Sequence, residues 1–331
     1  MTNDLVAVGE GLSTAQGTII GASLAVLAAV VALLGVLITR HQTGKHFTGS
    51  QRAAREQLLR DRYSQTAAQL GSDSSAIRLA GVYAIASLAD DWRDFGNDDE
   101  RQVCVNVLCA YLRTPPSPSR AKDLMAAEAA DHREQQVRDT AVAVIRSRAQ
   151  AAREGSAAGK WSGLSFDLTG ADLSQVDLTG VDLTGATLKN AHLTDAKLGD
   201  TKLGGAELGG ADLSRASLGH AHLAGANLDG TDLSDAYLRH ANLTDATLNA
   251  ADILATKLMH ADLTRADLRS AKLLHANLSG ATLRDTKLDH AKLDGTDLTG
   301  ATLGGTTDVS RANWEEEPIW PTGFTPPRPR R

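Results

Sequence analysis

Aromatic residues and cysteines are scarce in this chain of 331 residues, which has four Trp, four Tyr, four Phe and two Cys. The scarcity of large rings fits an interior filled by leucine and alanine. Cys104 and Cys109 lie five residues apart, a spacing that matches neither a Cys-x-x-Cys redox pair nor half of a metal site. We interpret both as buried, reduced core cysteines.

Catalytic motifs are also lacking. The sequence has no nucleophile elbow, no phosphate-binding loop and no His-Glu-x-x-His stretch. Ser, His and Asp are numerous, but they recur as interchangeable residues of a repeat. Residues 166–303 contain 12 Lys/Arg against 19 Asp/Glu, which disfavours direct nucleic-acid binding. We therefore expect a protein that is not an enzyme and that needs no cofactor.

What dominates the sequence is residues 166–305, which repeat every five residues. From Leu168 to Leu303, steps of five give Leu at 27 positions and Ile253 at one. The residue two before each is Ala in 20 of these 28 repeats. The other eight are Phe166, Val176, Val181, Thr201, Thr231, Thr256, Thr286 and Thr296. A short period held over this length indicates a repeat architecture.

A period of five fits neither standard element. On a helix, five residues advance about 500°, which would scatter the leucines around the axis. On a straight strand, successive leucines would alternate between faces. The residue two after each Leu is Gly in 11 repeats, Asp in five and Asn in one, and these residue types adopt turn conformations readily. The pattern predicts a solenoid that turns once per repeat around a column of leucines, with Ala or Thr where the wall is close.

The motif resembles that of the pentapeptide-repeat family, A(D/N)L(S/T/R)(G/D/H), as at residues 211–214 and 241–245. The resemblance implies an all-β, right-handed quadrilateral β-helix with four repeats per coil and about seven coils. A solenoid needs plugs that cover its two ends. We expect these to be Trp161, Leu164 and Phe166 at the start, and Val309, Trp314, Ile319 and Trp320 at the end.

A long apolar run lies near the N-terminus, where residues 19–38 are uncharged and rich in Leu, Val, Ile and Ala. This run is long enough to span a bilayer as a helix. A secretory signal peptide is the alternative, but the leader contains Asp4 and Glu10 and no Lys or Arg. The basic residues from Arg40 onward predict an outside N-terminus and a cytoplasmic remainder. We predict a single-pass cell-membrane protein with a transmembrane helix at residues 17–39.

The other segments complete the predicted domain plan. We expect helices at residues 51–70, from Ser74 or Ser75, and from Asp98 or Asp99. Residues 62–86 resemble the helical region that precedes pentapeptide repeats in actinobacterial membrane proteins. The plan is an extracytoplasmic N-terminus at 1–16, a helical region at 40–113, a Pro/Ser linker at 114–120, a helical stretch and cap at 121–165, the β-helix at 166–305, and a C-terminal cap and tail at 306–331.

Three histidines occupy the same turn position at intervals of 20 residues, namely His220, His240 and His260. If the solenoid has four sides, they stack about 4.8 Å apart along one edge. Such a ladder could bind a transition metal or titrate near neutral pH. The alternative is that His only tolerates the turn, as His275 and His290 do elsewhere.

Four-sided geometry also predicts an acidic side, with Arg215 among its carboxylates and Lys272 and Lys292 in later coils. The resemblance includes a fluoroquinolone-resistance branch thought to mimic DNA and occupy gyrase, and regularly spaced carboxylates can imitate phosphates. The alternative is an ordinary solvated face. The candidate partner-binding residues are Asp172, Asp195, Asp212, Asp232, Asp235 and Asp252.

Together these patterns predict a membrane-tethered scaffold that presents a rigid repeat surface to protein partners in the cytoplasm. The alternative function is a DNA-mimic inhibitor of a DNA-binding enzyme such as gyrase. We expect the partners to be the membrane, through one span, and an unidentified protein, with homo-oligomerisation open.

Overall fold

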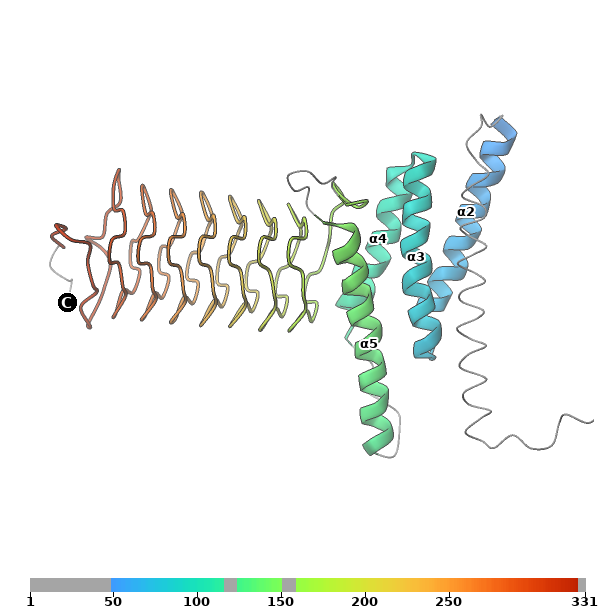
Figure 1. The fold of residues 1–331 in the computed structure, drawn as a ribbon, viewed down its shortest axis with the longest axis horizontal. Helices are drawn as coiled ribbons and strands as arrows, with labels where there is room; N and C mark the ends of the chain where they lie inside the picture. Colours follow the sequence, from blue (N-terminus) through green and yellow to red (C-terminus); the bar gives the residue numbers. More distant parts are fainter. Residues whose placement is uncertain (1–48, 116–123, 151–158, 327–331) are drawn as a thin grey trace, which may run out of the picture. The chain divides into compact units, whose positions relative to one another are not determined.

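The structure of the protein is a computed structural model that describes residues 49–115, 124–150 and 159–326. The chain divides into two compact units, Met1–Arg60 and Asp61–Arg331. Helix α2 (Gly49–Leu70) begins in the first unit, while α3 (Ser75–Phe95), α4 (Asp98–Arg113), α5 (Leu124–Arg148) and the solenoid belong to the second (Figure 1). The predicted span at 17–39 lies outside the described residues. None of the helices in the described part of the chain has the length and apolar character needed to cross a bilayer.

Helices α3 and α4 form a tight antiparallel pair. Gly96 ends α3 with a left-handed φ of 81°, and its N–H donates to Arg93 O at 3.0 Å. Asn97 then caps α4, since its Oδ1 accepts from the Glu100 N–H at 3.1 Å. The predicted caps Asp98 and Asp99 are wrong by one or two residues. They lie in the first turn of α4, where their charges favour the helix N-terminus.

The helical core lies between α3, α4 and α5. Helix α3 packs against both other helices and buries Val82, Ile85 and Leu88. An apolar stripe on α5, which comprises Val137, Ala141, Val144 and Ile145, is buried. Helices α4 and α5 therefore share one core, while most of the predicted linker at 114–120 lies outside the described residues.

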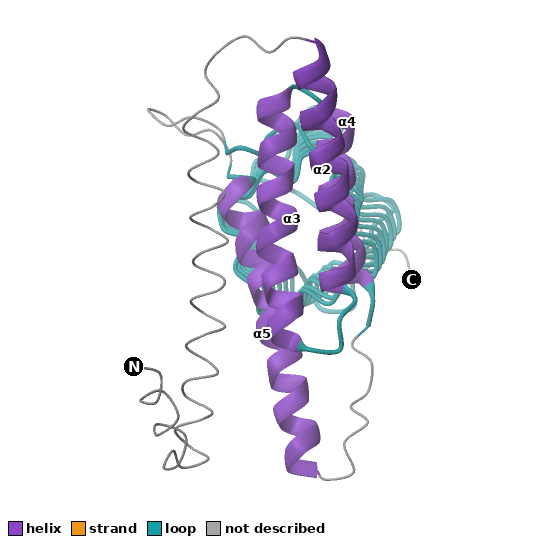
Figure 2. Ribbon diagram, turned by 90° about the vertical axis from the view of Figure 1, so that its right-hand side faces the viewer, coloured by secondary structure: helices purple, strands orange, loops and turns teal. Residues whose placement is uncertain are grey.

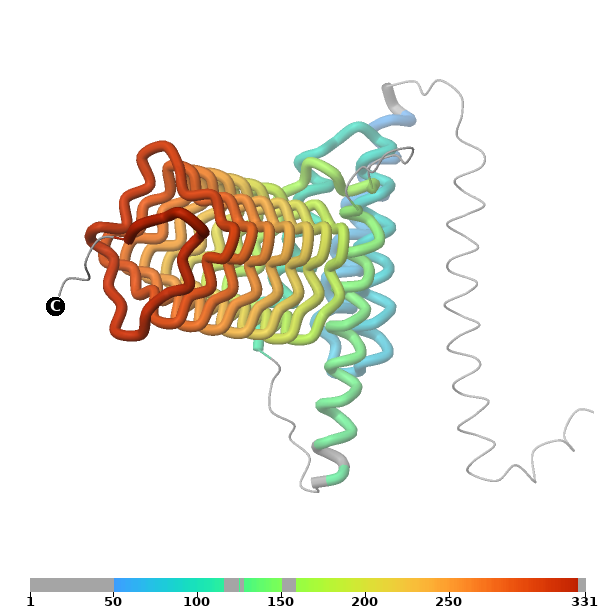
Figure 3. Tube along the Cα trace, turned by 60° about the vertical axis from the view of Figure 1, so that its left-hand side comes forward, coloured from blue at the N-terminus to red at the C-terminus, as the bar shows by residue number. Residues whose placement is uncertain are grey.

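The solenoid consists of stacked coils held together by parallel backbone pairing. From Asp167 to Thr282, each outward bridge residue pairs with the residue 20 positions later, as in Asp212 with Asp232, so one coil contains four repeats (Figure 3). The 28 repeats therefore form seven coils. Each side contributes one isolated bridge residue per coil, so the coils are drawn as loops in Figure 2 and no named strand occurs in the described residues.

The predicted interior is confirmed at nearly every repeat. Of the 28 Leu/Ile positions, 27 are buried, and Leu303 in the last coil is half-buried. The five inward threonines are buried as well, and each hydroxyl donates to the carbonyl of a leucine 23 residues earlier. For example, Thr231 Oγ1 donates to Leu208 O at 3.0 Å. Thr thus replaces Ala without leaving a buried polar group unpaired.

The predicted turn position adopts a left-handed conformation in all 28 repeats, with φ between 54° and 71°. Seventeen of these corner residues are not glycine, and 11 of the 17 are Asp, Asn or His. These types are enriched in this region of backbone space. Gln175, Ala250 and Ala255 are among the exceptions, and they carry backbone strain.

The residue before each leucine explains the preference for Asp and Asn in the motif. Its side-chain oxygen accepts the N–H of the residue two positions later, as from Ser234 to Asp232 Oδ1 at 2.9 Å. Asn does the same, as from Thr244 to Asn242 Oδ1 at 3.0 Å. This local acceptor stabilises the turn that follows.

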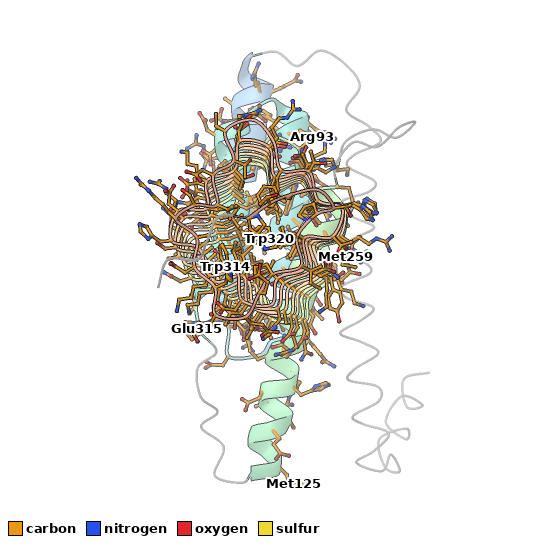
Figure 4. The ribbon with its side chains drawn as sticks, turned by 90° about the vertical axis from the view of Figure 1, so that its left-hand side faces the viewer. Arg93, Met125, Met259, Trp314, Glu315 and Trp320 are labelled. Carbon is orange, nitrogen blue, oxygen red and sulfur yellow. The ribbon has the colours of Figure 1, made fainter. Side chains whose placement is uncertain are left out.

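Both ends of the solenoid are covered. At the start, Trp161 and Phe166 are buried, and Asp182 N donates to Ala149 O at 2.6 Å, just after α5. At the far end, Trp314 is buried and stacks edge-on against Trp320 at 5.4 Å (Figure 4). Ile319, predicted as part of this cap, is instead exposed, because it continues an outward column by pairing with Asp297.

Candidate interaction surface

Four outward columns run along the solenoid, and we number its faces by the order of their bridge residues in the first coil. Face 1 begins at Asp167, face 2 at Asp172, face 3 at Asp177 and face 4 at Asp182. Because the coils repeat every 20 residues, each column holds one residue per coil at about the strand spacing of 4.8 Å. The side chains capable of binding a partner are therefore set at fixed intervals.

The histidine ladder forms as a stack at the corner between faces 3 and 4. The ring centroids of His220 and His240 are 5.0 Å apart, and those of His240 and His260 are 5.1 Å apart, with interplanar angles of 19° and 11°. Imidazole lone pairs lie in the ring plane, so parallel stacked rings do not converge on one ion. Among the described residues, no group of three His, Cys, Asp or Glu side chains is placed to hold a metal. Metal binding by the ladder stays an untested prediction.

Protonation of the ladder is disfavoured at its centre. Partial desolvation, followed by the positive charge of Arg239 and the two neighbouring imidazoles, lowers the pKa of His240 below its usual 6.5. Gly280 occupies the next corner, where a Cβ would lie 2.5 Å from His260 Nδ1. The ladder therefore ends where a residue without a side chain leaves room for the last ring.

The predicted acidic side occupies two neighbouring columns. Asp172, Asp212, Asp232 and Asp252 lie on face 2, with His192 between the first two. Asp195 and Asp235 lie at the corner beside face 2, with Arg215 between them in the column. The structure thus brings the predicted residues together, but it also places cations among them.

Most of these carboxylates already have partners. Arg215 donates two hydrogen bonds to Asp195, at 2.9 and 2.8 Å, and thereby holds the pKa of that carboxyl below its usual value. Lys272 Nζ lies 3.0 Å from Asp252 Oδ2. Burial raises the pKa of Asp212, but hydrogen bonds from Ser214 and Thr194 outweigh it, and the net shift is downward. Asp172, Asp212, Asp232 and Asp252 also accept the N–H two residues later, so their charge is combined with a structural role.

Face 3 is a surface that the sequence reading did not single out. Tyr237 is 54% exposed at its centre, with Lys257 in the next coil and Lys197 two coils earlier. Arg239 and Met259 follow the leucines of the same coils, and Met259 lies at the side of the solenoid in Figure 4. A signal was present in the sequence, since an exposed Tyr at the bridge position is unique among the repeats.

A groove of about 540 Å³ lies between α5 and the first coil. Its lining is largely polar and includes Asp139, Arg146, Asp172 and Asp177. Arg146 Nη1 lies 3.1 Å from Asp177 Oδ2, so part of the lining is already paired.

The helical region contains buried polar networks that the sequence reading missed. Asp90 accepts from Trp161 Nε1 at 3.2 Å and lies near Lys160 Nζ and Arg148 Nε, at 3.1 and 3.3 Å. Glu134 bonds Arg78 Nη2 and the Tyr111 hydroxyl at 2.7 and 2.8 Å. Burial and the contact with Glu134 raise the pKa of Tyr111 to about 12.

The two cysteines lie in the apolar core of the same region. Both are free and buried, and burial raises the pKa of each thiol to about 12. A thiol held protonated in this way is a poor nucleophile and a poor metal ligand.

The comparisons with known proteins concern the solenoid. The family model for pentapeptide repeats matches in overlapping segments from residue 167 to residue 300. A pentapeptide repeat protein of Nostoc is 37% identical, with 31% of this chain and 84% of that chain covered and a TM-score of 0.28. HetL, a Nostoc pentapeptide repeat protein involved in heterocyst differentiation regulation, is 31% identical over 46% of this chain and 87% of that chain, with a TM-score of 0.28.

The chain belongs to the pentapeptide-repeat family. Membership implies that the four-sided solenoid is a right-handed β-helix. QnrB1, a plasmid-mediated fluoroquinolone resistance protein, is 20% identical over 48% of this chain and 81% of that chain, with a TM-score of 0.36. No curated protein sequence matches the chain.

Proposed function

We propose that the pentapeptide-repeat solenoid is a non-enzymatic protein-interaction module, a scaffold held at the cell membrane by the span predicted at residues 17–39. The supporting observation is that the solenoid separates an apolar interior from a polar exterior. Leu, Ala and Thr fill the interior, and the polar side chains are displayed outward in straight columns. A surface of this kind suits recognition of another macromolecule.

Chemical crosslinking of the full chain in its native membranes, followed by mass spectrometry, tests this function. The proposal expects crosslinks between outward solenoid lysines, such as Lys197 or Lys257, and one recurring protein. A matched chain that lacks residues 17–39 should lose the membrane fraction and keep the partner. Crosslinks confined to the helices, or no recurring partner, would contradict the scaffold function.

A DNA-mimic inhibitor is the second candidate, because Asp212, Asp232 and Asp252 follow one another on face 2 at the coil spacing. Its weakness is the pairing of Asp252 with Lys272 and of Asp195 with Arg215. The sharpest test is Asp212→Asn with Asp232→Asn, since Asn removes the charge and keeps the oxygen that accepts the turn N–H. Inhibition of gyrase by the wild type, lost in this double variant, would favour mimicry. No inhibition by the wild type would exclude it.

A further inference from the structure

We propose that face 3 of the solenoid docks an extended acidic segment of the partner protein. Its docking surface comprises Lys197, Tyr237, Arg239, Lys257 and Met259, with the histidine ladder along one edge. The inference rests on the proposed interaction function, and it adds the face and the chemistry of the partner.

Charge is the first reason. Among the described residues, no ion pair joins Lys197, Arg239 or Lys257 to a carboxylate, whereas Arg215, Arg265 and Lys272 at other positions of the solenoid are all paired. On face 3 itself, no Asp or Glu occurs between Asp177 in the first coil and Asp297 in the last. Asp177 is the neighbour of Lys197 in the same column and interacts with it electrostatically, and the bordering corners hold Asp195 and Asp235 on one side and Asp200 on the other. Arg239 and Lys257 have no carboxylate beside them on face 3, and such cations favour an anionic partner.

The second reason is exposed apolar surface at the same place. Within the repeats, the large hydrophobic side chains that stand out from the surface are Tyr237 and Leu254, which are 54% and 39% exposed. Leu254 follows Ile253 of face 2 and precedes the corner that leads to Lys257, so it borders face 3, whereas Tyr237 lies in its central column. Tyr, Met and Arg are enriched at the centres of protein interfaces. Tyr237 is thus placed as an aromatic anchor between cations.

Spacing supports an extended ligand. Lys197 and Lys257 are three coils apart in one column, which corresponds to about 14 Å at the usual strand spacing. An extended peptide of about four or five residues covers that length. Acidic side chains at the two ends of such a segment would meet the two lysines, with an apolar residue over Tyr237.

The histidine ladder should make this docking pH-dependent. Arg239 lies beside it, Asp200 precedes it in the same column, and His222 and Asp262 lie on the adjoining face 4. Protonation of His240, whose pKa lies below its usual 6.5, adds positive charge along the edge of face 3 as the pH falls below that value. Affinity for an acidic segment should therefore rise as the pH falls.

The test is fluorescence anisotropy of the full chain in detergent with a labelled oligo-glutamate peptide that carries one central leucine. We expect binding that weakens with salt, and a loss of about tenfold or more in Arg239→Glu with Lys257→Glu and in Tyr237→Ala. None of these side chains forms a hydrogen bond with another residue in the described part of the chain, so the melting temperature should stay unchanged. The matched control is Lys292→Glu, at a bridge position of face 2 whose lysine forms no ion pair with the residues that the structure describes, and this variant should bind as the wild type does.

The docking surface would be overturned if the peptide did not bind. It would also be overturned if Lys292→Glu lost as much affinity for the peptide as the face 3 variants do. Binding of phosphatidylglycerol vesicles or single-stranded DNA, with no binding of the peptide, would overturn it as well. A partner that crosslinks equally well to the wild type and to the Tyr237→Ala chain would also overturn it and leave the scaffold function standing. Absence of any crosslinked partner would instead contradict the scaffold function.

Discussion

The solenoid and the helical region achieve stability in different ways. In the solenoid, each repeat makes the same contacts as its neighbours, with a buried leucine, a small inward residue and a left-handed corner. In the helical region, individual groups such as the buried Asp90 and the half-buried Glu134 bond partners from distant segments. The solenoid therefore spreads its stability over equivalent positions, whereas the helical region concentrates it in a few unique contacts.

This difference affects where function can evolve. Outward positions of a repeat are free to vary, because the leucines and corners beneath them fix the backbone. Side chains such as Tyr237 and Arg239 can therefore be chosen for a partner without disturbing the fold. The helical region has less freedom of this kind, because its buried groups depend on individual partners.

The largest expected loss of stability comes from opening a cavity in the solenoid. Leu223→Ala removes a fully buried side chain and should lower the free energy of unfolding by about 2–5 kcal/mol. Leu243→Ala, one coil later, should have a similar effect, because the two sites are equivalent. Urea unfolding followed by circular dichroism measures both. If either variant unfolded at the same urea concentration as the wild type, the placement of these leucines inside the solenoid would be refuted.

The next largest loss of stability is expected when a contact that occurs once in the helical region is removed. Asp90→Ala removes the acceptor of the buried Trp161 N–H and should destabilise the chain by about 1–3 kcal/mol. The neighbouring Asp91 pairs with Arg62 near the surface, so Asp91→Ala should change stability by less than about 1 kcal/mol. Thermal melts of the two variants compare them directly. Equal losses of stability in the two variants would mean that the network around Asp90 contributes no more than the surface pair of Asp91.

Corner residues allow a smaller, two-way test. Gly205→Ala places a side chain in open space at a φ of 62°, so it should cost about 1 kcal/mol through backbone strain alone. Ala250→Gly relieves the strain at a φ of 57° and should be neutral or stabilising by less than about 1 kcal/mol. Ala246→Gly, at a buried inward position, is the control and should destabilise. In urea unfolding, we expect Ala250→Gly to leave the free energy of unfolding unchanged or to raise it, and Ala246→Gly to lower it.

The smallest effect concerns pH. The folded state lowers the pKa of His240, so the folded state binds this proton less readily than the unfolded chain. Its contribution to stability is therefore complete above about pH 6.5 and is lost as the pH falls from there through the lower pKa of the folded state. In NMR titrations, His220→Asn with His260→Asn should raise the pKa of His240, since Asn tolerates the corner conformation. An unchanged titration would show that the neighbouring imidazoles do not interact with it.

The regular part of the fold could be predicted from the sequence because its determinants are local. The Ala-x-Leu spacing and the turn residue recur every five positions, and the corner at Gln175 follows the same rule as that at Gly205. The stack of His220, His240 and His260 followed from the four-sided register alone. The α4 cap at Asn97 was missed by one residue, because several adjacent residues were suitable caps.

The candidate site was less predictable. The acidic residues were placed near one another correctly, but their neutralisation by Arg215 and Lys272 depends on side chains that lean from one coil to the next. Contacts such as Asp90 with Trp161 join residues 71 positions apart and leave no periodic trace. Ile319 was placed in the cap because it is apolar, although the register of the last coil directs it outward.

The most direct test of the scaffold function is site-specific photocrosslinking in living cells. A photoreactive phenylalanine would replace Thr247, Asp232, Ser217 and Asn242, one on each face of the solenoid, and Ile77, an exposed residue of α3. We predict that one solenoid position, Ser217 on face 3, captures a single partner strongly and that Ile77 does not. Capture at Ile77 with none at the four solenoid positions would contradict the account and move the function to the helical region.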